Sequence, residues 1–426
     1  RGIRHPKSLF HYTRSSIIRQ ETERTIIHPV GYSLRRPMSE RERRVGRDIS
    51  VPWALTFVAL VAFLDTFAML PILAPYAQAL GATEAHTGVI VGVYSLANLL
   101  ASLVSGMLLD RFGRRLPMVF SLFAAATLIA LYGVVPTSDA LLIVRALHGI
   151  SGAVFIPALF ALVGEHGQAN RVWAMGRTGA VIGLVALIAP PVAGIVTDRY
   201  GERSLFFGIA ALMGFAGLLA LLGLSESRVR PPREARIDPL VVLRQPAMLG
   251  VYLLTFGMTF AMGMLAYRLP VMLELSGYGA TYRGRLFGLF ALLAIGVMAS
   301  VRRRTLLGGA FRRAMIGGGL IALGALSLEG FAPPYGALAA VVVFGLGFGL
   351  CFPAVHLLSY EGVALHLRGV ALAVLYAFYS LGYVLGPTSA GLLADILLPG
   401  MLSTIVASFC LLLAWVLAGQ GVYSQM

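Results

Sequence analysis

The chain is 426 residues long, 58% hydrophobic and only 12% charged, with a formal net charge of +15. Soluble domains carry about a quarter charged residues, so this composition excludes an ordinary globular enzyme and indicates an integral membrane protein. The excess of positive charge does not indicate nucleic-acid binding, because the basic residues gather in the first 50 residues and in loops expected on one side of the membrane.

No cofactor or resident metal is expected. The sequence has no Gly-rich phosphate loop of the P-loop type, which argues against ATP as the energy source. Cys351 and Cys410 both lie inside apolar segments, and we interpret them as packing residues and not as a disulfide or metal ligands.

Residues 1–50 form a polar, Arg-rich tail without the apolar segment of a secretory signal peptide. It holds 12 of the 34 basic residues and is expected to be a cytoplasmic extension. We expect this positively charged tail to bind the anionic lipids of a membrane surface, and docking to an acidic protein partner is the alternative.

Twelve apolar segments follow, each near the roughly 20 residues that a helix needs to span a bilayer. The segments predict an all-α membrane protein, because a transmembrane barrel would show short alternating strands instead. They cover approximately 51–76, 87–109, 116–135, 140–163, 174–197, 204–224, 247–273, 285–301, 312–329, 334–358, 369–394 and 400–420.

Asp65 is the only acidic side chain in the interior of any of these segments. A carboxylate at bilayer depth is costly unless it is protonated, paired or facing water. A direct use for such a group is to take up and release a proton.

The loop between the second and third segments reads Gly106-Met-Leu-Leu-Asp110-Arg111-Phe-Gly113-Arg114-Arg115. It resembles the signature loop of the major facilitator superfamily, Gly-x-Leu-x-Asp-Arg-x-Gly-Arg-Arg/Lys. The resemblance implies a gate that latches the two halves of the protein in the outward-facing state. Physically, Gly106 would let its helix approach a neighbour, Gly113 would permit a tight turn, and Asp110 would accept hydrogen bonds. The alternative is a merely topological basic loop.

The fourth segment contains Arg145 and His148 in a pattern that resembles the family's motif with a membrane-embedded arginine, often assigned to proton coupling. We expect Arg145 to reach Asp65 and, with it, to form the coupling site, the alternatives being a static ion pair or a snorkelling arginine. His148 is a candidate proton partner or substrate contact, although a hydrogen-bonded interior histidine is the favoured interpretation, as it is for His356.

The fifth segment resembles the Gly-x-x-x-Gly-Pro-x-x-Gly-Gly motif of the family's antiporters, with alanine replacing two glycines at Ala189 and Ala193. Small residues and prolines allow close packing and bending, so a hinge between rocking halves is expected, with ordinary helix packing as the alternative. The candidate hinge residues in the fifth and eleventh segments are Gly183, Pro190, Pro191, Gly194, Gly386, Pro387 and Gly391.

The two halves look like an internal duplication at an offset of about 195 residues. Thr66-Phe67-Ala68-Met69, for example, recurs as Thr259-Phe260-Ala261-Met262. We therefore expect an N-terminal six-helix bundle over 51–224, a charged cytoplasmic linker over 225–246 and a C-terminal six-helix bundle over 247–426, related by a pseudo-two-fold axis.

In this family the substrate site lies between the halves, which suggests a set of aromatic and polar residues as its lining. Aromatic walls with few fixed polar groups suit apolar or amphipathic substrates. The candidates are Tyr94, Asn98, Tyr252, Tyr267, Tyr376, Tyr379 and Tyr383.

The resemblance implies a proton-coupled secondary transporter, not an enzyme, that exports a small amphipathic organic compound by alternating access. It is most similar to the twelve-helix drug:proton antiporter branch. A multi-pass protein of a bacterial inner membrane with both termini cytoplasmic is expected. The alternatives are a transporter of one specific metabolite and a non-transporting scaffold subunit of a membrane complex.

Overall fold

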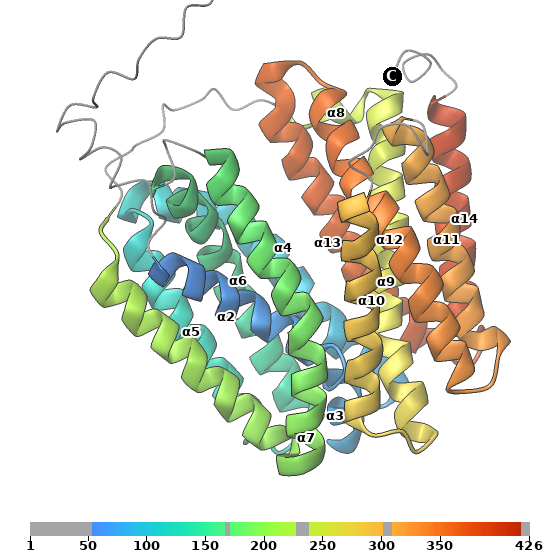
Figure 1. Cartoon of the computed structure of the whole chain (residues 1–426), viewed down its shortest axis with the longest axis horizontal. Coiled ribbons are helices and arrows are strands. Elements are labelled where there is room, and N and C mark those ends of the chain that lie inside the picture. Colours follow the sequence, from blue (N-terminus) through green and yellow to red (C-terminus); the bar gives the residue numbers. More distant parts are fainter. Residues whose placement is uncertain (1–52, 167–170, 227–237, 301–308, 419–426) are drawn as a thin grey trace, which may run out of the picture. The chain divides into compact units, whose positions relative to one another are not determined.

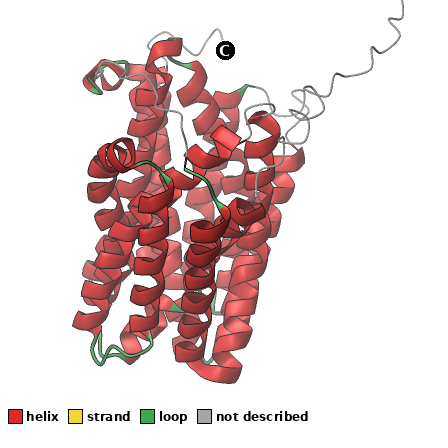
Figure 2. Cartoon of the chain, turned by 90° about the vertical axis from the view of Figure 1, so that its left-hand side faces the viewer, coloured by secondary structure: helices red, strands yellow, loops and turns green. Residues whose placement is uncertain are grey.

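The computed structural model describes residues 53–166, 171–226, 238–300 and 309–418. The basic tail, part of the linker and the second-half loop with Arg302, Arg303 and Arg304 therefore lie outside the described residues. Within these ranges the chain is helical and has no strand (Figure 2). The elements are α2 (Trp53–Met69), α3 (Leu73–Ala79), α4 (Glu84–Phe112), α5 (Arg115–Tyr132), α6 (Ser138–His166), α7 (Arg171–Gly223), α8 (Leu240–Leu243), α9 (Pro246–Leu275), α10 (Ala280–Ser300), α11 (Ala310–Gly330), α12 (Tyr335–Glu361), the 3-10 helix η2 (Leu365–Leu367), α13 (Arg368–Leu392) and α14 (Pro399–Ala418).

Twelve membrane spans can be counted in the described residues. Ten helices are long and apolar enough to cross a bilayer, and the bent pair α2–α3 makes eleven. The 53-residue α7 holds two spans, because its helix is interrupted at Gly201, where φ is 80°. That break falls between the predicted segments 174–197 and 204–224.

The first predicted segment, 51–76, is wrong as a single helix. The chain bends by 54° between α2 and α3. Pro71 lies at this bend, where a proline removes a backbone donor and its ring clashes with the preceding turn. The amides on both sides of Pro71 bond three residues back, from Leu70 to Phe67 and from Ile72 to Met69.

The helices form two groups that follow the two halves of the sequence (Figure 1). In the first half, α2 and α5 contact α7, and α6 contacts α4 and α5. In the second half, α9 contacts α13 and α14, and α12 contacts α10 and α11. The halves meet mainly through two pairs, α4 with α13 and the first part of α7 with α10. This is the twelve-helix, two-bundle architecture that the duplicated sequence predicts.

Candidate functional site

The two halves are joined at the end of the bundle that carries the turns at Gly81, Gly201 and Gly277, which we call the Gly201 end. The opposite end carries Trp53 and Gly113 and is called the Trp53 end. A Cβ atom added at Gly88 on α4 would lie 2.2 Å from the carbonyl oxygen of Pro387 on α13. Real Cβ atoms do not come so close, so only glycine permits this approach.

The second pair of helices repeats the same contact. A Cβ at Gly284 on α10 would lie 2.2 Å from the Pro190 carbonyl oxygen of α7. One turn further along, Gly194 meets Ala280 at 2.3 Å and Gly391 meets Glu84 at 2.4 Å, measured in the same way. The duplicated Gly and Pro residues of the fifth and eleventh segments thus form a seam between the halves.

Not all candidate hinge residues belong to this seam. A Cβ at Gly183 would have only an ordinary contact, 3.5 Å from Ile295. A Cβ at Gly386 would lie 2.1 Å from the Phe260 carbonyl oxygen, so this glycine joins α13 to α9 inside the second half. Pro191 contacts α10 at Gly288.

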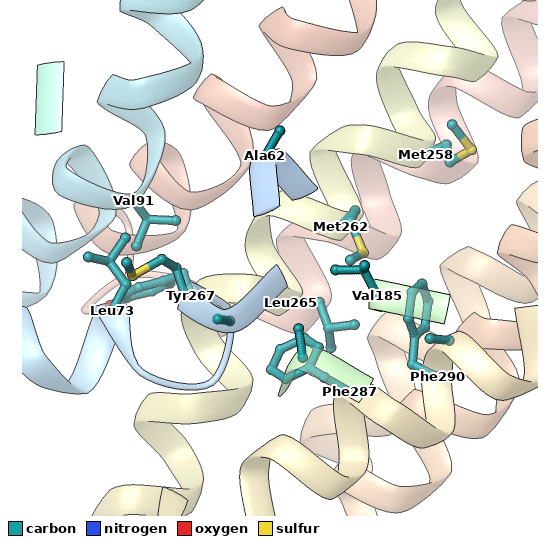
Figure 3. Close-up of a cluster of buried hydrophobic side chains, with 14 of the residues drawn as sticks. Ala62, Leu73, Val91, Val185, Met258, Met262, Leu265, Tyr267, Phe287 and Phe290 are labelled. Carbon is teal, nitrogen blue, oxygen red and sulfur yellow. The ribbon is translucent and has the colours of Figure 1, made fainter. Parts of the chain in front are cut away.

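A cluster of buried apolar side chains contains residues of both halves (Figure 3). It draws on α2, α3, α4 and α7 of the first half and on α9 and α10 of the second. Its labelled members are Ala62, Leu73, Val91, Val185, Met258, Met262, Leu265, Tyr267, Phe287 and Phe290. Tyr267, a substrate candidate, is fully buried in this cluster, so it does not line an open cavity in this state.

At the Trp53 end, the signature loop is tied to the start of the linker. Gly113 ends α4 with a φ of 79°. The amides of Arg114 and Arg115 donate to Oε1 of Glu226 at 2.7 and 3.3 Å, and Arg114 also pairs with Glu165. A Cβ at Gly113 would lie 2.6 Å from this Glu226 carboxylate, so the position needs glycine for space as well as for its φ. Sequence reasoning missed Glu226, whose one signal was its place at the start of the charged linker.

The rest of the loop is open. Asp110 is exposed and has no hydrogen bond or ion pair with any residue that the structure describes, and Arg111 stacks on Phe112 at 5.3 Å. The expectation that Gly106 lets its helix approach a neighbour is wrong for this state, since nothing lies within 4 Å of a Cβ added there. The structure is therefore closed at the Gly201 end, and Asp110 is not engaged at the Trp53 end.

Asp65 is buried on α2, with only 2% of its surface exposed. Its Oδ2 lies 3.3 Å from Nε2 of His148 on α6, which is fully buried. The distance is that of an ion pair, but the angles are not those of a hydrogen bond. Neither Nε2 of His148 nor Oδ1 of Asp65 therefore has a hydrogen-bond partner among the described residues. The predicted direct pair of Asp65 with Arg145 is not formed, because His148 occupies the place beside the carboxylate.

Arg145 reaches the carboxylate through two intermediates. Its Nη1 donates to Tyr132 Oη at 3.3 Å, and that hydroxyl lies 2.9 Å from Nδ1 of His148. The guanidinium also lies over the ring of Tyr94, 4.8 Å from its centre. The sequence did not indicate that Tyr132 takes part in this site; it showed only a tyrosine near the end of the third apolar segment. The four helices α2, α4, α5 and α6 thus bring one acid, one imidazole, one arginine and two phenols together.

The remaining substrate candidates separate into two places. Asn98 donates to the Gly149 carbonyl at 3.3 Å and, with Tyr94, joins α4 to α6. In the second half, an aromatic wall runs along α12 and α13. Tyr376 is exposed, and Tyr379 and Tyr383, both half-buried, follow it at ring separations of 6.3 and 6.2 Å.

Two neighbours complete this wall. The His356 ring lies 5.6 Å from Tyr376. Tyr252 is fully buried against Phe378 at 5.5 Å and supports the wall from behind.

Two repeated helical halves, a seam closed at one end and a buried ionisable centre are the features of a multi-pass membrane transporter. The Major Facilitator Superfamily model matches residues 55–387. The chain belongs to this family and is a transporter, not an enzyme.

The chain is similar to several known family members. It is 24% identical over 367 residues to an uncharacterized MFS-type transporter of Methanocaldococcus jannaschii, covering 83% of this chain and 93% of the relative. It is 32% identical to multidrug resistance protein MdtG of Enterobacter lignolyticus, over 42% of this chain and 44% of the relative. It is 34% identical to the inner membrane transport protein YajR of Escherichia coli, over 38% and 35% respectively. The chain thus matches less than half of MdtG and YajR.

Two solved structures support the fold. A bacterial homologue of the human lysosomal transporter Spinster, crystallised in an inward-facing and unoccupied conformation, aligns with a TM-score of 0.69 at 15% identity, covering 86% of this chain and 94% of the homologue. The nucleoside transporter NupG aligns with a TM-score of 0.72 at 14% identity, covering 86% and 98%.

Proposed function

We propose that the protein exports a small amphipathic organic compound in exchange for protons, and that Asp65 binds the proton. The observation that carries the proposal is a carboxylate with 2% exposure whose nearest charged or titratable contact is His148 at 3.3 Å. Ionised acids inside a membrane are costly and mark proton relays in transporters. A neutral Asp65 is therefore stable in a closed, dry site, and water access from one side lets the proton leave.

The orientation follows from the basic residues. Among the described residues, Arg145 apart, nine arginines lie near the Trp53 end, against five near the Gly201 end: Arg199, Arg203, Arg268, Arg283 and Arg285. The positive-inside rule then makes the Trp53 end cytoplasmic. With that orientation the structure is the inward-facing state, and the apolar cluster and the seam separate Asp65 from the outside. The name of YajR supports a place in a bacterial inner membrane.

Exchange requires that proton and substrate favour different states. In the inward-facing state the proton leaves Asp65 towards the cytoplasm, and a substrate then binds the site. In the outward-facing state the substrate leaves and a proton from outside returns to Asp65. The signature loop, with Asp110 engaged, would hold the cytoplasmic side closed in that second state.

The aromatic wall supports an amphipathic, ring-containing substrate. Tyr376, Tyr379 and Tyr383 offer stacking surfaces of large area, and His356 adds a polar edge. The multidrug names among the relatives agree with this substrate class.

Transport of a panel of amphipathic dyes and metabolites into proteoliposomes, driven by an imposed pH gradient, tests the proposal. Asp65→Asn is expected to abolish gradient-driven transport while leaving counterflow of the substrate in the absence of a gradient. Asp139→Asn is the matched control, because that carboxylate is 86% exposed at the Gly201 end and is expected to leave transport unchanged. Gradient-driven transport by Asp65→Asn would contradict proton binding at Asp65. A wild-type protein that transports none of the panel would instead favour the scaffold alternative.

A further inference from the structure

One hydroxyl connects the arginine to the histidine beside the proton site. Among the described residues, Tyr132 Oη is the only group that is hydrogen-bonded to both, lying 3.3 Å from Nη1 of Arg145 and 2.9 Å from Nδ1 of His148. Both Tyr132 and His148 are fully buried. Buried polar groups of this kind need to satisfy their hydrogen bonds, so the protons of the chain can be counted.

Only one assignment of protons satisfies both hydrogen bonds of the Tyr132 hydroxyl. Arginine has no acceptor, so Arg145 donates and Tyr132 Oη accepts. The phenol has a single proton, and among the described residues His148 Nδ1 is the only acceptor within hydrogen-bond reach of it. Nδ1 therefore accepts, and the proton of the neutral ring lies on Nε2, which is 3.3 Å from Asp65 Oδ2 in an electrostatic contact without hydrogen-bond angles.

A doubly protonated His148 does not fit this arrangement. Its Nδ1–H would have to donate to the same oxygen that already accepts from Arg145, and the phenol proton would lose its acceptor in a buried site. An unsatisfied buried donor is costly, and a second positive charge beside Arg145 adds to that cost. The neutral ring, by contrast, leaves one negative Asp65 and one positive Arg145 in balance.

We therefore propose that Tyr132 is a positioning residue that holds His148 as the neutral Nε2–H tautomer, so that the exchangeable proton of the site binds to Asp65 and not to His148. This inference rests on the proposed proton coupling at Asp65. It assigns a role to a residue on α5 that contacts neither the carboxylate nor the aromatic wall.

Two further contacts surround Tyr132 without involving its hydroxyl. Tyr76 donates its own hydroxyl to the Tyr132 backbone carbonyl at 2.5 Å, and the Phe206 ring contacts the Tyr132 ring edge-on at 5.6 Å. Because α5 ends at Tyr132, this carbonyl has no helical partner and the Tyr76 bond satisfies it.

The titratable and charged groups around His148 come from five helices. They are Asp65 on α2, Tyr94 on α4, Tyr132 on α5, Arg145 on α6 and, within electrostatic range of Arg145, Tyr383 on α13. Asp65 and Arg145 are the two members of this set that can carry a formal charge near neutral pH. Their charges and the hydrogen bond from Tyr132 together determine which nitrogen of His148 carries a proton.

Nitrogen NMR of the full-length protein in lipid nanodiscs at neutral pH tests the proposal. With ¹⁵N-labelled histidine, the signals of His148 are assigned among the eight histidines by their loss in His148→Asn. The wild type is expected to show an unprotonated Nδ1 and a protonated Nε2. In Tyr132→Phe the unprotonated Nδ1 signal is expected to be lost and replaced by a protonated one, as the second tautomer or as imidazolium.

Tyr76→Phe is the matched control, because it removes the hydrogen bond to the Tyr132 carbonyl but leaves the Tyr132 hydroxyl, and it is expected to keep the wild-type spectrum. A protonated Nδ1 in the wild type would overturn the inference whether or not Tyr132→Phe folds, and so would an unchanged Nδ1 in Tyr132→Phe. This readout needs no transport. Failure of the tautomer assignment is thus distinct from failure of proton coupling, which the Asp65→Asn flux measurement reports.

Discussion

Gly284 lies directly against the carbonyl oxygen of Pro190, so that a Cβ on this glycine would come within 2.2 Å of it. The contact crosses from the second half of the protein to the first, and Gly88 repeats it with Pro387. Close approach of two helix backbones at glycine is a common device of membrane proteins. Here it occurs twice and sets how tightly the Gly201 end can close.

Gly284→Ala is expected to shift the protein away from the state that is closed at the Gly201 end. Overpacking of a tight contact costs about 1–3 kcal/mol, which is comparable with the few kcal/mol that separate conformational states. Distances between spin labels introduced by Tyr200→Cys and Leu275→Cys, both exposed positions at the Gly201 end, measure the shift. The native Cys351 and Cys410 are buried and do not compete for the label.

Gly208→Ala is the control for this substitution, since a Cβ at Gly208 meets nothing within 4 Å. It is expected to leave the label distances unchanged. Identical distance distributions for Gly284→Ala and the wild type would show that the seam does not limit closure.

Asp198→Asn is expected to weaken the same closure through electrostatics. The Asp198 carboxylate on α7 accepts from the amides of Ala280 and Thr281 at 2.9 and 2.8 Å, and so caps the first turn of α10 across the seam. Asparagine keeps one acceptor oxygen but loses the charge and the second acceptor, which costs up to about 1 kcal/mol, equivalent to at most a roughly five-fold change in the ratio of states. The same label pair, in membranes without substrate, reports the change as a larger population of long distances.

Asp395→Asn is the matched control, because Asp395 is the counterpart of Asp198 in the duplicated sequence but does not cap α4. There Thr83 caps the helix, and Glu84 in its first turn already supplies a negative charge. An effect of Asp395→Asn as large as that of Asp198→Asn would refute the asymmetric role of the two carboxylates.

Glu226→Ala is expected to lower the thermal stability of the protein in detergent. The carboxylate accepts from the Arg114 and Arg115 amides at the start of α5, and losing this cap costs about 1 kcal/mol. Glu226→Gln keeps an amide oxygen in place and should recover part of the loss. Glu361→Ala, at an exposed position near the end of α12, should have no effect. Equal melting temperatures for all three variants and the wild type would contradict the role of Glu226.

Tyr376→Ala is expected to weaken the binding of ring-containing substrates by about two- to thirteen-fold, since an aromatic pair contributes about 0.5–1.5 kcal/mol. Fluorescence anisotropy of a bound dye measures this change. Tyr335→Ala removes an exposed tyrosine at the Gly201 end and serves as the control. Unchanged dye affinity in Tyr376→Ala would place the substrate away from the aromatic wall.

Much of the architecture could be predicted from the sequence, because the bilayer imposes strong rules on it. A span needs about 20 apolar residues, so the segments from 87–109 onward lie within a few residues of α4 to α14. The exception is the bend at Pro71, where a continuous apolar run conceals a break in the helix. The sequence also marks Asp65 as a residue that needs a physical explanation, because an acid in hydrocarbon is costly.

The partners of Asp65 were decided only by the tertiary structure. Arg145 and His148 lie one turn apart on α6, and the sequence placed both on the same side of one helix without indicating which of them faces α2. The rotation of α6 is set by its close packing on α4, where Gly149 and Gly152 contact Tyr94. Local sequence determines which helices form and where they cross the membrane. The contacts between helices, made by residues far apart in the chain, determine that His148 meets the carboxylate while Arg145 reaches it through Tyr132.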